Sequence, residues 1–344
     1  MHRKGTAVAE QTNGPACGLV YSGIGGQAVL EGVMMRSGAD YAVALRRGDG
    51  RITVHKQRYE GLLAGSPLRK IPLVRGVIVF IDSLVLGMRC TNESSDAYME
   101  EEEGAEGSSS GDSGWMTAAV VVLAFALAIG LFMLLPYFLS ALIGRLIGNR
   151  LLTLILEGVL RVLIFIAYVA GISLMEDIRR LYRFHGAEHK CINCIESGLP
   201  LTVENARAST RFHKRCGSSF LMFVVLVSIV VCFFIRTEQP LLRVVLRIAL
   251  FPVIAGISYE FIRLAGTYQN PVLNAISAPG LWLQRITTGE PDDEMLRVGI
   301  ASVEAVFDWK TWLCENYGFR REDLPDNGVT FELTEDEDAV QGSL

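Results

Sequence analysis

The feature that most constrains this chain is an unbroken apolar stretch at residues 116–143, which contains no charged side chain. About 20 apolar residues suffice for an α-helix to cross the hydrocarbon core of a bilayer. A helix also satisfies its backbone hydrogen bonds within a single segment, as that environment requires. Pro136, near one end of the stretch, is expected to bend the helix. We therefore expect a transmembrane helix here.

Three further apolar segments follow, at residues 151–175, 218–235 and 244–259. The last has a short charge-free centre, so a re-entrant segment is the alternative to a complete span. Half of all residues are hydrophobic and the mean hydropathy is +0.33, both high for a soluble domain. The sequence thus predicts a mainly α, multi-pass membrane protein with about four transmembrane helices and a small cytoplasmic α+β region at its N-terminal side.

The second apolar segment contains two charged residues, Glu157 and Arg161. They are one helical turn apart, so they can pair on one face and partly neutralise each other. A structural pair is the favoured interpretation over a proton relay. A transporter is disfavoured because the sequence has no internal repeat and no pair of broken helices.

Basic residues are concentrated between the second and third spans, in residues 176–217. Because cytoplasmic loops carry an excess of Lys and Arg, we expect this loop, and with four spans both termini, on the cytoplasmic side of the cell membrane. The net charge of −5 reflects acidic runs at residues 100–112 and 332–338, and the remainder is basic. That balance suits the lipid bilayer, with a membrane-protein or peptide partner at its cytoplasmic face, and not nucleic acid.

Composition divides the chain into six predicted segments. In order, these are a disordered leader at residues 1–17, a cytoplasmic glycine-rich α+β region with an interfacial helix at 18–99, a flexible acidic linker at 100–114, a four-span membrane domain at 115–265 with the cytoplasmic loop 176–217, a cytoplasmic helical region at 266–321 and a disordered acidic tail at 322–344. The leader is polar and lacks the apolar core of a signal peptide.

Two short runs of β-type residues, 41–45 and 51–54, predict a β-hairpin, since glycines flank Asp49 between them. The glycines of residues 18–30 match neither a Walker nor a Rossmann spacing, which favours structural turns over a phosphate-binding loop. Residues 74–88 predict an apolar helix that is shorter than a typical span and lies at the membrane interface or against the helix bundle.

The loop between the second and third spans begins with the motif H-x-x-E-H, formed by His185, Glu188 and His189. On a helix the two histidines project from one face and can bind one metal ion. This is the inverzincin order, in which the histidines hold zinc and the glutamate activates a water molecule. Residues 177–184 contain no helix breaker, so we expect the second span to continue into the motif.

His213 and Cys216 add two ligand types where the chain returns to the same membrane face. Three of the five histidines and three of the seven cysteines lie between residues 185 and 216. If all four candidate ligands bind zinc, the site is closed and structural, whereas catalysis needs an open position. Cys191 and Cys194 form a C-x-x-C without a second pair, and we expect them to be small buried residues.

Three other carboxylates are candidates to complete the site. Glu31 and Glu290 lie in loops marked by glycine or proline. Glu260 lies at the end of the fourth segment, where pairing with Arg263 is the favoured alternative to metal binding.

Four separated motifs give the chain a family resemblance: GGQAVLEGVMMR at residues 25–36, HGAEHK at 185–190, HKRCGSSF at 213–220 and TTGEPDD at 287–293. Together they resemble the YqhQ-like bacterial membrane proteins, a domain-of-unknown-function family described as predicted metal-dependent enzymes. The resemblance covers the chain from about Gly18 to Trp309. It implies a multi-pass membrane protein with a metal site at His185, Glu188, His189, His213 and Cys216. Gly289 stands where an arginine is usual in the family.

Two functional hypotheses follow. In the first, the protein is a zinc-dependent hydrolase in which His185 and His189 bind the metal with His213 or Cys216, and Glu188 is the general base. A peptide or a lipid head group near the cytoplasmic membrane face would be its substrate. In the second, the protein is a non-enzymatic membrane scaffold or assembly factor, with a structural metal site or none.

Overall fold

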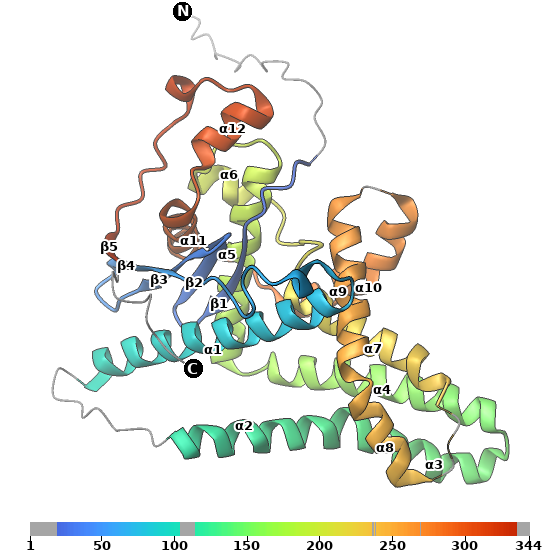
Figure 1. Ribbon diagram of the computed structural model, residues 1–344. Helices are drawn as coiled ribbons and strands as arrows, with labels where there is room; N and C mark the ends of the chain where they lie inside the picture. The colour runs from blue at the N-terminus through green and yellow to red at the C-terminus, as the bar shows by residue number, and fades with distance from the viewer. Residues whose placement is uncertain (1–18, 104–113, 236, 238, 269, 336–344) are drawn as a thin grey trace, which may run out of the picture.

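The computed structural model describes residues 19–103, 114–235, 237, 239–268 and 270–335. The predicted leader and most of the predicted acidic linker lie outside these residues. The described part is mainly helical and contains one small sheet, as the sequence predicts. Figure 1 shows the sheet and the helices around it at the upper left, and the apolar helices below and to the right of them.

The sheet has five strands in the order β1-β2-β3-β4-β5. Neighbouring strands among the first four are antiparallel, and the last two are parallel: β1 (Gly25–Val29), β2 (Gly32–Ser37), β3 (Asp40–Arg46), β4 (Ile52–Arg58) and β5 (Glu332–Glu335). The predicted hairpin is confirmed as β3 and β4, in which Arg46 pairs with Ile52 and Gly50 takes a positive φ of 86°. Disorder of the predicted acidic tail is wrong for residues 332–335, because they pair with β4 and form the edge strand β5.

Both faces of the sheet are buried, and the alternation of side chains along each strand explains how. Val33, Met35 and Ala44 face one hydrophobic cluster with α5 and α11. Met34 and Val43 point the other way, to a second cluster with α1. The helices of this layer are α1 (Val74–Glu103), α5 (Glu176–Glu196), α6 (Val203–Ala208), α11 (Asp293–Val306) and α12 (Trp309–Tyr317), with 3-10 turns η1 (Pro67–Lys70) and η3 (Arg321–Asp323).

Helix α1 is longer than the predicted interfacial helix, since it continues through the first residues of the predicted acidic linker to Glu103. It lies under the sheet, opposite α5 and α11 (Figure 1). Leu86 and Cys90 are the α1 side chains buried against the sheet. The helix therefore belongs to the layer formed by the sheet and the helices packed on it, which we call the folded layer, and it also lies next to the apolar helices.

The apolar helices form the second part of the molecule: α2 (Gly114–Ile129), the π-helical turn η2 (Gly130–Leu134), α3 (Leu135–Ile147), α4 (Arg150–Ile172), α7 (Gly217–Phe233), α8 (Pro240–Ala249), α9 (Phe251–Thr267) and α10 (Pro271–Thr287). Two of the described helices are long and apolar enough to cross a membrane, Ala119–Ile147 and Arg150–Ile172. A third is obtained if α8 and α9, which are bent by 41°, count as one broken span. Helix α7 is apolar but has only 17 residues.

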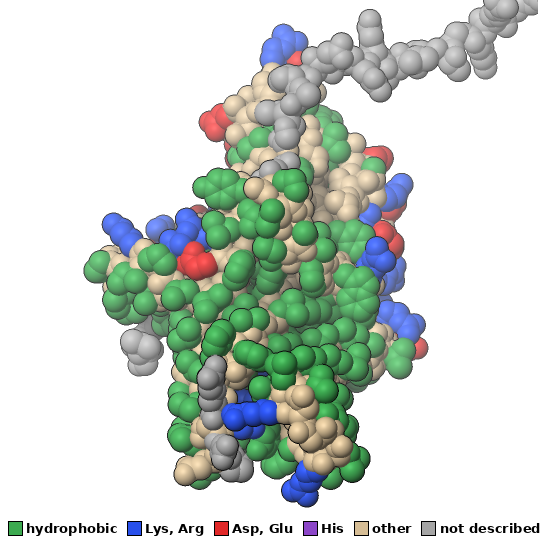
Figure 2. Space-filling view, turned by 90° about the vertical axis from the view of Figure 1, so that its right-hand side faces the viewer, with side chains coloured by type: hydrophobic (Ala, Val, Ile, Leu, Met, Phe, Trp, Pro, Cys, Tyr) green, Lys and Arg blue, Asp and Glu red, His purple; other side chains and the backbone are tan. Residues whose placement is uncertain are grey.

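Local sequence explains several features of these helices. The π-helical turn directly precedes Pro136, whose ring and missing N–H disturb regular α-helical bonding there. Asn149 caps α4 by accepting hydrogen bonds from the amides of Leu151 and Leu152. Hydrophobic side chains cover much of the lower surface of this part, with a few basic side chains near its bottom end (Figure 2).

The prediction that the second span continues into the metal motif is wrong. Helix α4 ends at Ile172, and α5 begins at Glu176 after an extended residue, Met175. Glu176 and Asp177 occupy the first turn of α5, where acidic side chains favour a new helix start through the helix dipole. Figure 1 shows α5 turning away from α4 and running up beside the sheet. The motif therefore belongs to the folded layer.

Candidate metal centre

Three segments of the chain meet at the motif. Helix α5 carries His185, Glu188 and His189, with the last two buried. Cys216 is the N-cap of α7, and its thiol is buried at the same point. The C-terminal end of α10 packs beside α7 and supplies the backbone of Thr287. The site thus lies where the folded layer meets the ends of two apolar helices.

Both motif histidines are oriented by backbone carbonyl groups. Nδ1 of His185 lies 2.8 Å from the carbonyl oxygen of Thr287, and Nδ1 of His189 lies 2.6 Å from that of Arg211. A carbonyl oxygen only accepts, so each Nδ1 must carry the proton and donate it. In a neutral ring this leaves Nε2 with a free lone pair. Metal-binding histidines usually have this arrangement.

The two Nε2 atoms and the Cys216 sulfur form a compact group. Ligand atoms of His185, His189 and Cys216 all lie within 4.8 Å of one another, and His185 Nε2 is 3.0 Å from Cys216 Sγ. Neighbouring ligand atoms of a tetrahedral zinc, with bonds of about 2.3 Å to sulfur and 2.0 Å to nitrogen, lie roughly 3.3–3.6 Å apart. Small side-chain movements would therefore fit the three atoms around one ion.

His189 provides a second indication of a missing ligand. Its Nε2 is buried and has no hydrogen-bond partner among the residues that the structure describes, and its ring is 1% exposed. Leaving a buried polar atom unpaired costs about 1–3 kcal/mol. A metal ion at the centre of the group would satisfy this nitrogen.

The charges of the site favour a thiolate. Burial raises the pKa of the Cys216 thiol, but the neighbouring imidazoles of His185 and His189 outweigh burial and hold that pKa well below its usual range. Burial lowers the pKa of His185, but the sulfur of Cys216 and the carboxylate of Glu188 outweigh burial and raise that pKa to about 9. Without metal, these shifts favour a thiolate at Cys216 beside an imidazolium at His185. The thiolate is also the form that binds metal.

Glu188 lies next to the ligand atoms, with one carboxylate oxygen 3.9 Å from His185 Nε2. Burial raises its pKa above the usual range. Strand β1 packs directly on it, and a Cβ at Gly26 would lie 2.9 Å from Glu188 Cγ and 2.6 Å from the Met34 carbonyl oxygen. The glycine-rich segment is therefore needed for close approach at the site, a role that its spacing does not reveal.

The structure does not bring His213 into this group. Its Nε2 lies 3.6 Å from a carboxylate oxygen of Glu196, which also pairs with Arg215. Gln284 holds the backbone of His213 by accepting from its N–H and donating to its carbonyl oxygen. The rings of His213 and His189 are neighbours, with centroids 5.5 Å apart. His213 is therefore next to His189 but belongs to a separate buried ionic cluster with Glu196 and Arg215.

Cys191 and Cys194 are fully buried on the other side of α5, in the cluster with the sheet and α11. Burial raises the pKa of both thiols, that of Cys194 to about 12. This confirms the prediction that they are small buried residues.

The three additional carboxylates all pair with basic side chains. Glu290 is mostly exposed and lies 3.1 Å from Lys190 Nζ and 3.4 Å from Arg211 Nε. Glu260 forms a two-pronged pair with Arg75, a partner that the sequence did not suggest, and lies 3.8 Å from the predicted partner Arg263.

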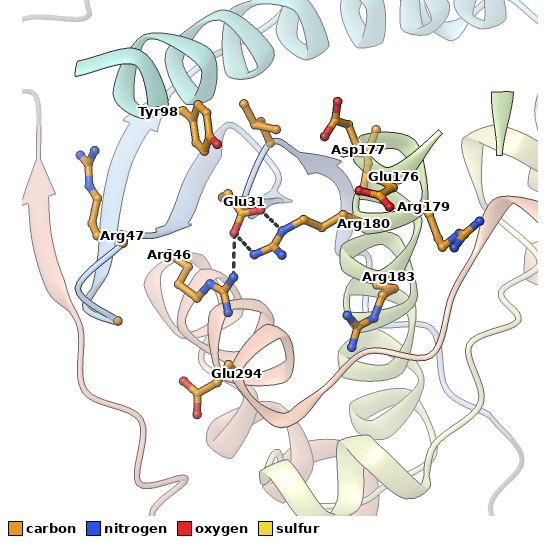
Figure 3. Close-up of a pocket in the computed structure, with 14 residues that line it drawn as sticks. Glu31, Arg46, Arg47, Tyr98, Glu176, Asp177, Arg179, Arg180, Arg183 and Glu294 are labelled. Carbon is orange, nitrogen blue, oxygen red and sulfur yellow. Dashed lines mark hydrogen bonds and ion pairs between the residues drawn. The ribbon is translucent and has the colours of Figure 1, made fainter. Parts of the chain in front are cut away.

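Glu31 lies in the largest of the cavities described, about 1130 Å³ in volume, beside the first turns of α5. Figure 3 shows its carboxylate between Arg46 and Arg180, with further arginines around the cavity. These charged side chains are partly exposed, and the motif histidines do not line the cavity.

The TTGEPDD segment packs closely against the motif helix. A Cβ at Gly186 would collide with the carbonyl oxygen of Gly289, and Gly289 N–H donates to the Tyr182 carbonyl oxygen. Arg183 occupies the space beside Gly289 and pairs with Asp292 at 2.9 Å. An arginine of α5 therefore connects the motif helix to this segment.

Comparison with known proteins identifies similarity over most of the chain. A family model described as "Protein of unknown function (DUF1385)" matches residues 71–309. The chain is 38% identical over 286 residues to "Uncharacterized protein YqhQ" of Bacillus subtilis (strain 168), covering 81% of this chain and 90% of that protein. No solved structure matches the chain. The matched region contains the three candidate ligand residues and Glu188.

Proposed function

Since this chain belongs to the family described as protein of unknown function (DUF1385), whose description assigns no reaction, we propose a function from the site itself. The protein is an integral membrane metalloprotein, a zinc-dependent hydrolase acting at the cytoplasmic membrane face. His185, His189 and Cys216 hold the ion, and Glu188 is the general base.

One observation carries this proposal. Two histidines present Nε2 toward one thiol, and each Nδ1 is fixed by a backbone carbonyl oxygen. An ordinary buried histidine needs partners for both nitrogens, yet His189 Nε2 has none among the described residues. The donor set of two imidazoles and a thiolate suits zinc.

Three ligands leave one position of a tetrahedral ion open, which favours catalysis over a purely structural site. Bound zinc supplies a Lewis acid and makes water acidic near neutral pH. Glu188 lies beside the candidate ligand atoms, where it would accept a proton from water activated by the ion, and its raised pKa would help it to hold that proton. His185 and His189 keep their lone pairs aimed at the ion because Thr287 and Arg211 fix their rings.

The apolar helices support a location in the cell membrane, with the basic loop and both termini on the cytoplasmic side. The site is next to the first turn of α7, so it would lie close to the bilayer surface. A peptide or a lipid head group at that surface is the proposed substrate class.

A metal-free cysteine hydrolase is a second candidate function. The specific observation is the 3.0 Å contact between Cys216 Sγ and His185 Nε2, with Cys216 at the N-terminus of α7. A thiolate stabilised by an imidazolium and a helix N-terminus is an activated nucleophile.

Metal analysis of the purified full-length protein separates these functions. We expect one zinc per chain in the parent protein, in Glu188→Gln and in the control His55→Ala, whose ring is remote from the site on β4. His185→Ala and Cys216→Ala should lose the zinc. His213→Ala should retain it, because His213 pairs with Glu196 instead.

Activity then distinguishes the hydrolase from a scaffold. Glu188→Gln that retains zinc but loses function in cells supports hydrolysis, while full function in that variant would favour a scaffold. A parent protein without metal rejects the zinc site. Loss of function in Cys216→Ala in that metal-free case would point to the cysteine mechanism.

A further inference from the structure

A second group of buried charges lies among the apolar helices and shares no residue with the metal motif. Glu157 and Arg161 on α4 form the predicted pair, with Arg161 Nη2 3.0 Å from Glu157 Oε1. Arg247 of α8 binds the same oxygen at 2.6 Å. All three side chains are at most 7% exposed. The sequence did not suggest Arg247 as a partner.

Two guanidinium groups thus share one carboxylate, which leaves one positive charge without a counter-charge. Arg161 also donates to Ser228 Oγ, but a hydroxyl group is neutral. Nε of Arg161 and Nε of Arg247 are buried and have no hydrogen-bond partner in the described part of the chain. An uncompensated buried charge is costly, whereas a bound anion would neutralise it.

A cavity of about 560 Å³ opens beside this group between α4 and α7, and both arginines line it. Its other walls are mainly apolar. The cavity opens at the apolar outer surface of the helices. Six of its lining residues are exposed on that surface, namely Ile155, Val159, Leu163, Val230, Phe233 and Phe234. The cavity therefore has basic side chains, Arg161 and Arg247, at its buried end and apolar side chains at its opening.

A second cavity of about 230 Å³ extends the charged region toward the end of the helices. It shares Leu154 and Glu157 with the first cavity. It reaches Arg243 of α8, and Asn149 and Arg150 where α4 begins. Among the described residues that line these two cavities, Glu157 is the single acid. A few basic side chains are visible near the bottom end of the hydrophobic surface in Figure 2. The cavities thus join a helix end to the buried arginines.

We propose that this pair of cavities binds an anionic phospholipid, with its phosphate against Arg161 and Arg247 and one acyl chain along the apolar walls. The single negative charge of a phosphodiester equals the surplus positive charge. Guanidinium groups also match phosphate oxygens in geometry. Because Glu157 lies in the first half of α4 and α5 follows its other end, this lipid belongs to the leaflet away from the metal centre.

This inference rests on the proposed membrane location but not on the metal. The test uses full-length protein in a neutral detergent, with thermal unfolding followed as phosphatidylglycerol, phosphatidylcholine or inorganic phosphate is added. We expect phosphatidylglycerol to bind about tenfold more tightly than phosphatidylcholine and to raise the unfolding midpoint accordingly, because both lipids carry a phosphodiester but the choline cation of phosphatidylcholine cancels its charge and is repelled by the arginines. Inorganic phosphate should have no effect, since it cannot use the apolar walls.

Arg161→Gln and Arg247→Gln are the informative variants. Each leaves Glu157 with one arginine, a balanced pair, so both should fold and lose the preference for phosphatidylglycerol. Arg145→Gln is the matched control, because Arg145 is exposed at the end of α3 and lines neither cavity. It should keep the preference.

Equal stabilisation by both lipids would overturn the proposal, as would an undiminished preference in the two cavity variants. Stabilisation by inorganic phosphate alone would show that the arginines bind a free anion and not a lipid. Zinc is measured in the same preparations, and Arg161→Gln should retain it. In the parent protein, the absence of a lipid effect when zinc is bound rejects this inference alone, whereas a lipid effect without bound zinc rejects the metal centre alone.

Discussion

Replacing Gly186 by alanine tests whether the backbone around His185 sets metal affinity. The new Cβ would overlap the carbonyl oxygen of Gly289, and about 1 Å of backbone movement is needed to relieve the overlap. The segment that must move contains Thr287, whose carbonyl oxygen orients the His185 ring at 2.8 Å. The substitution therefore affects the ligand through its support and not through the metal itself.

Two magnitudes follow for Gly186→Ala. Forcing an extra methyl group into a packed site lowers the free energy of unfolding by about 1–3 kcal/mol. Loss of a partner that orients a metal-binding histidine weakens metal binding about 10–100-fold. Thermal unfolding measures the first effect, and competition with a chromophoric zinc chelator measures the second.

Two alanine variants provide the controls. A Cβ at Gly217, beside the ligand Cys216, has no atom within 4 Å, so Gly217→Ala should leave both measurements unchanged. Gly289→Ala would contact Arg183 Cγ at 2.8 Å, and because that side chain can move, its effect should be smaller than that of Gly186→Ala. Parent-like stability and zinc affinity in Gly186→Ala would refute this explanation of the site.

Three further predictions use other parts of the molecule. In metal-free protein at pH 6, Cys216 should react with iodoacetamide while Cys191 and Cys194 do not, because the pKa of the Cys216 thiol is lowered and those of the other two are raised. Added zinc should protect Cys216, and peptide mass mapping that finds Cys191 or Cys194 modified in its place would contradict this prediction. Asp308→Ala should cost about 1 kcal/mol at neutral pH because Asp308 caps α12. The pKa of this carboxyl is lowered to about 2, mainly by hydrogen bonding from Thr311, so its contribution is complete above the ordinary pKa near 4 and disappears as pH falls through 2, where the unfolding curves of variant and parent should converge. In sealed cells, an impermeant thiol reagent should leave the partly exposed Cys314 unlabelled, and strong labelling would contradict the cytoplasmic placement of the α12 region.

Periodic features of the sequence predicted the local structure well. The spacing of His185 and His189 places them on one face of a helix, and the apolar runs correspond to helices. The hairpin of β3 and β4 also follows from its glycines. Each of these features is determined within a few residues of chain, so a pattern of residue types is enough to find it.

Long-range partners were not predictable in the same way. His213 and Cys216 are three residues apart and seemed equivalent as ligands, but Glu196 and Arg215 hold the His213 ring in another cluster. The groups that orient His185 and His189 are backbone carbonyls, and any residue type supplies those. The break before α5 had a sequence signal in Glu176 and Asp177, which favour a helix start more than a continued span.

The position of Cys216 at the start of an apolar helix has a consequence for biogenesis. Two of the proposed ligands belong to α5, in the layer with the sheet, while the third lies 27 residues beyond His189 at the N-cap of α7. An ion bound by all three can be captured only once α7 has taken its place beside the folded layer. Metal uptake would then be a late step of assembly, and zinc starvation during synthesis would leave chains whose two parts are each formed but poorly joined.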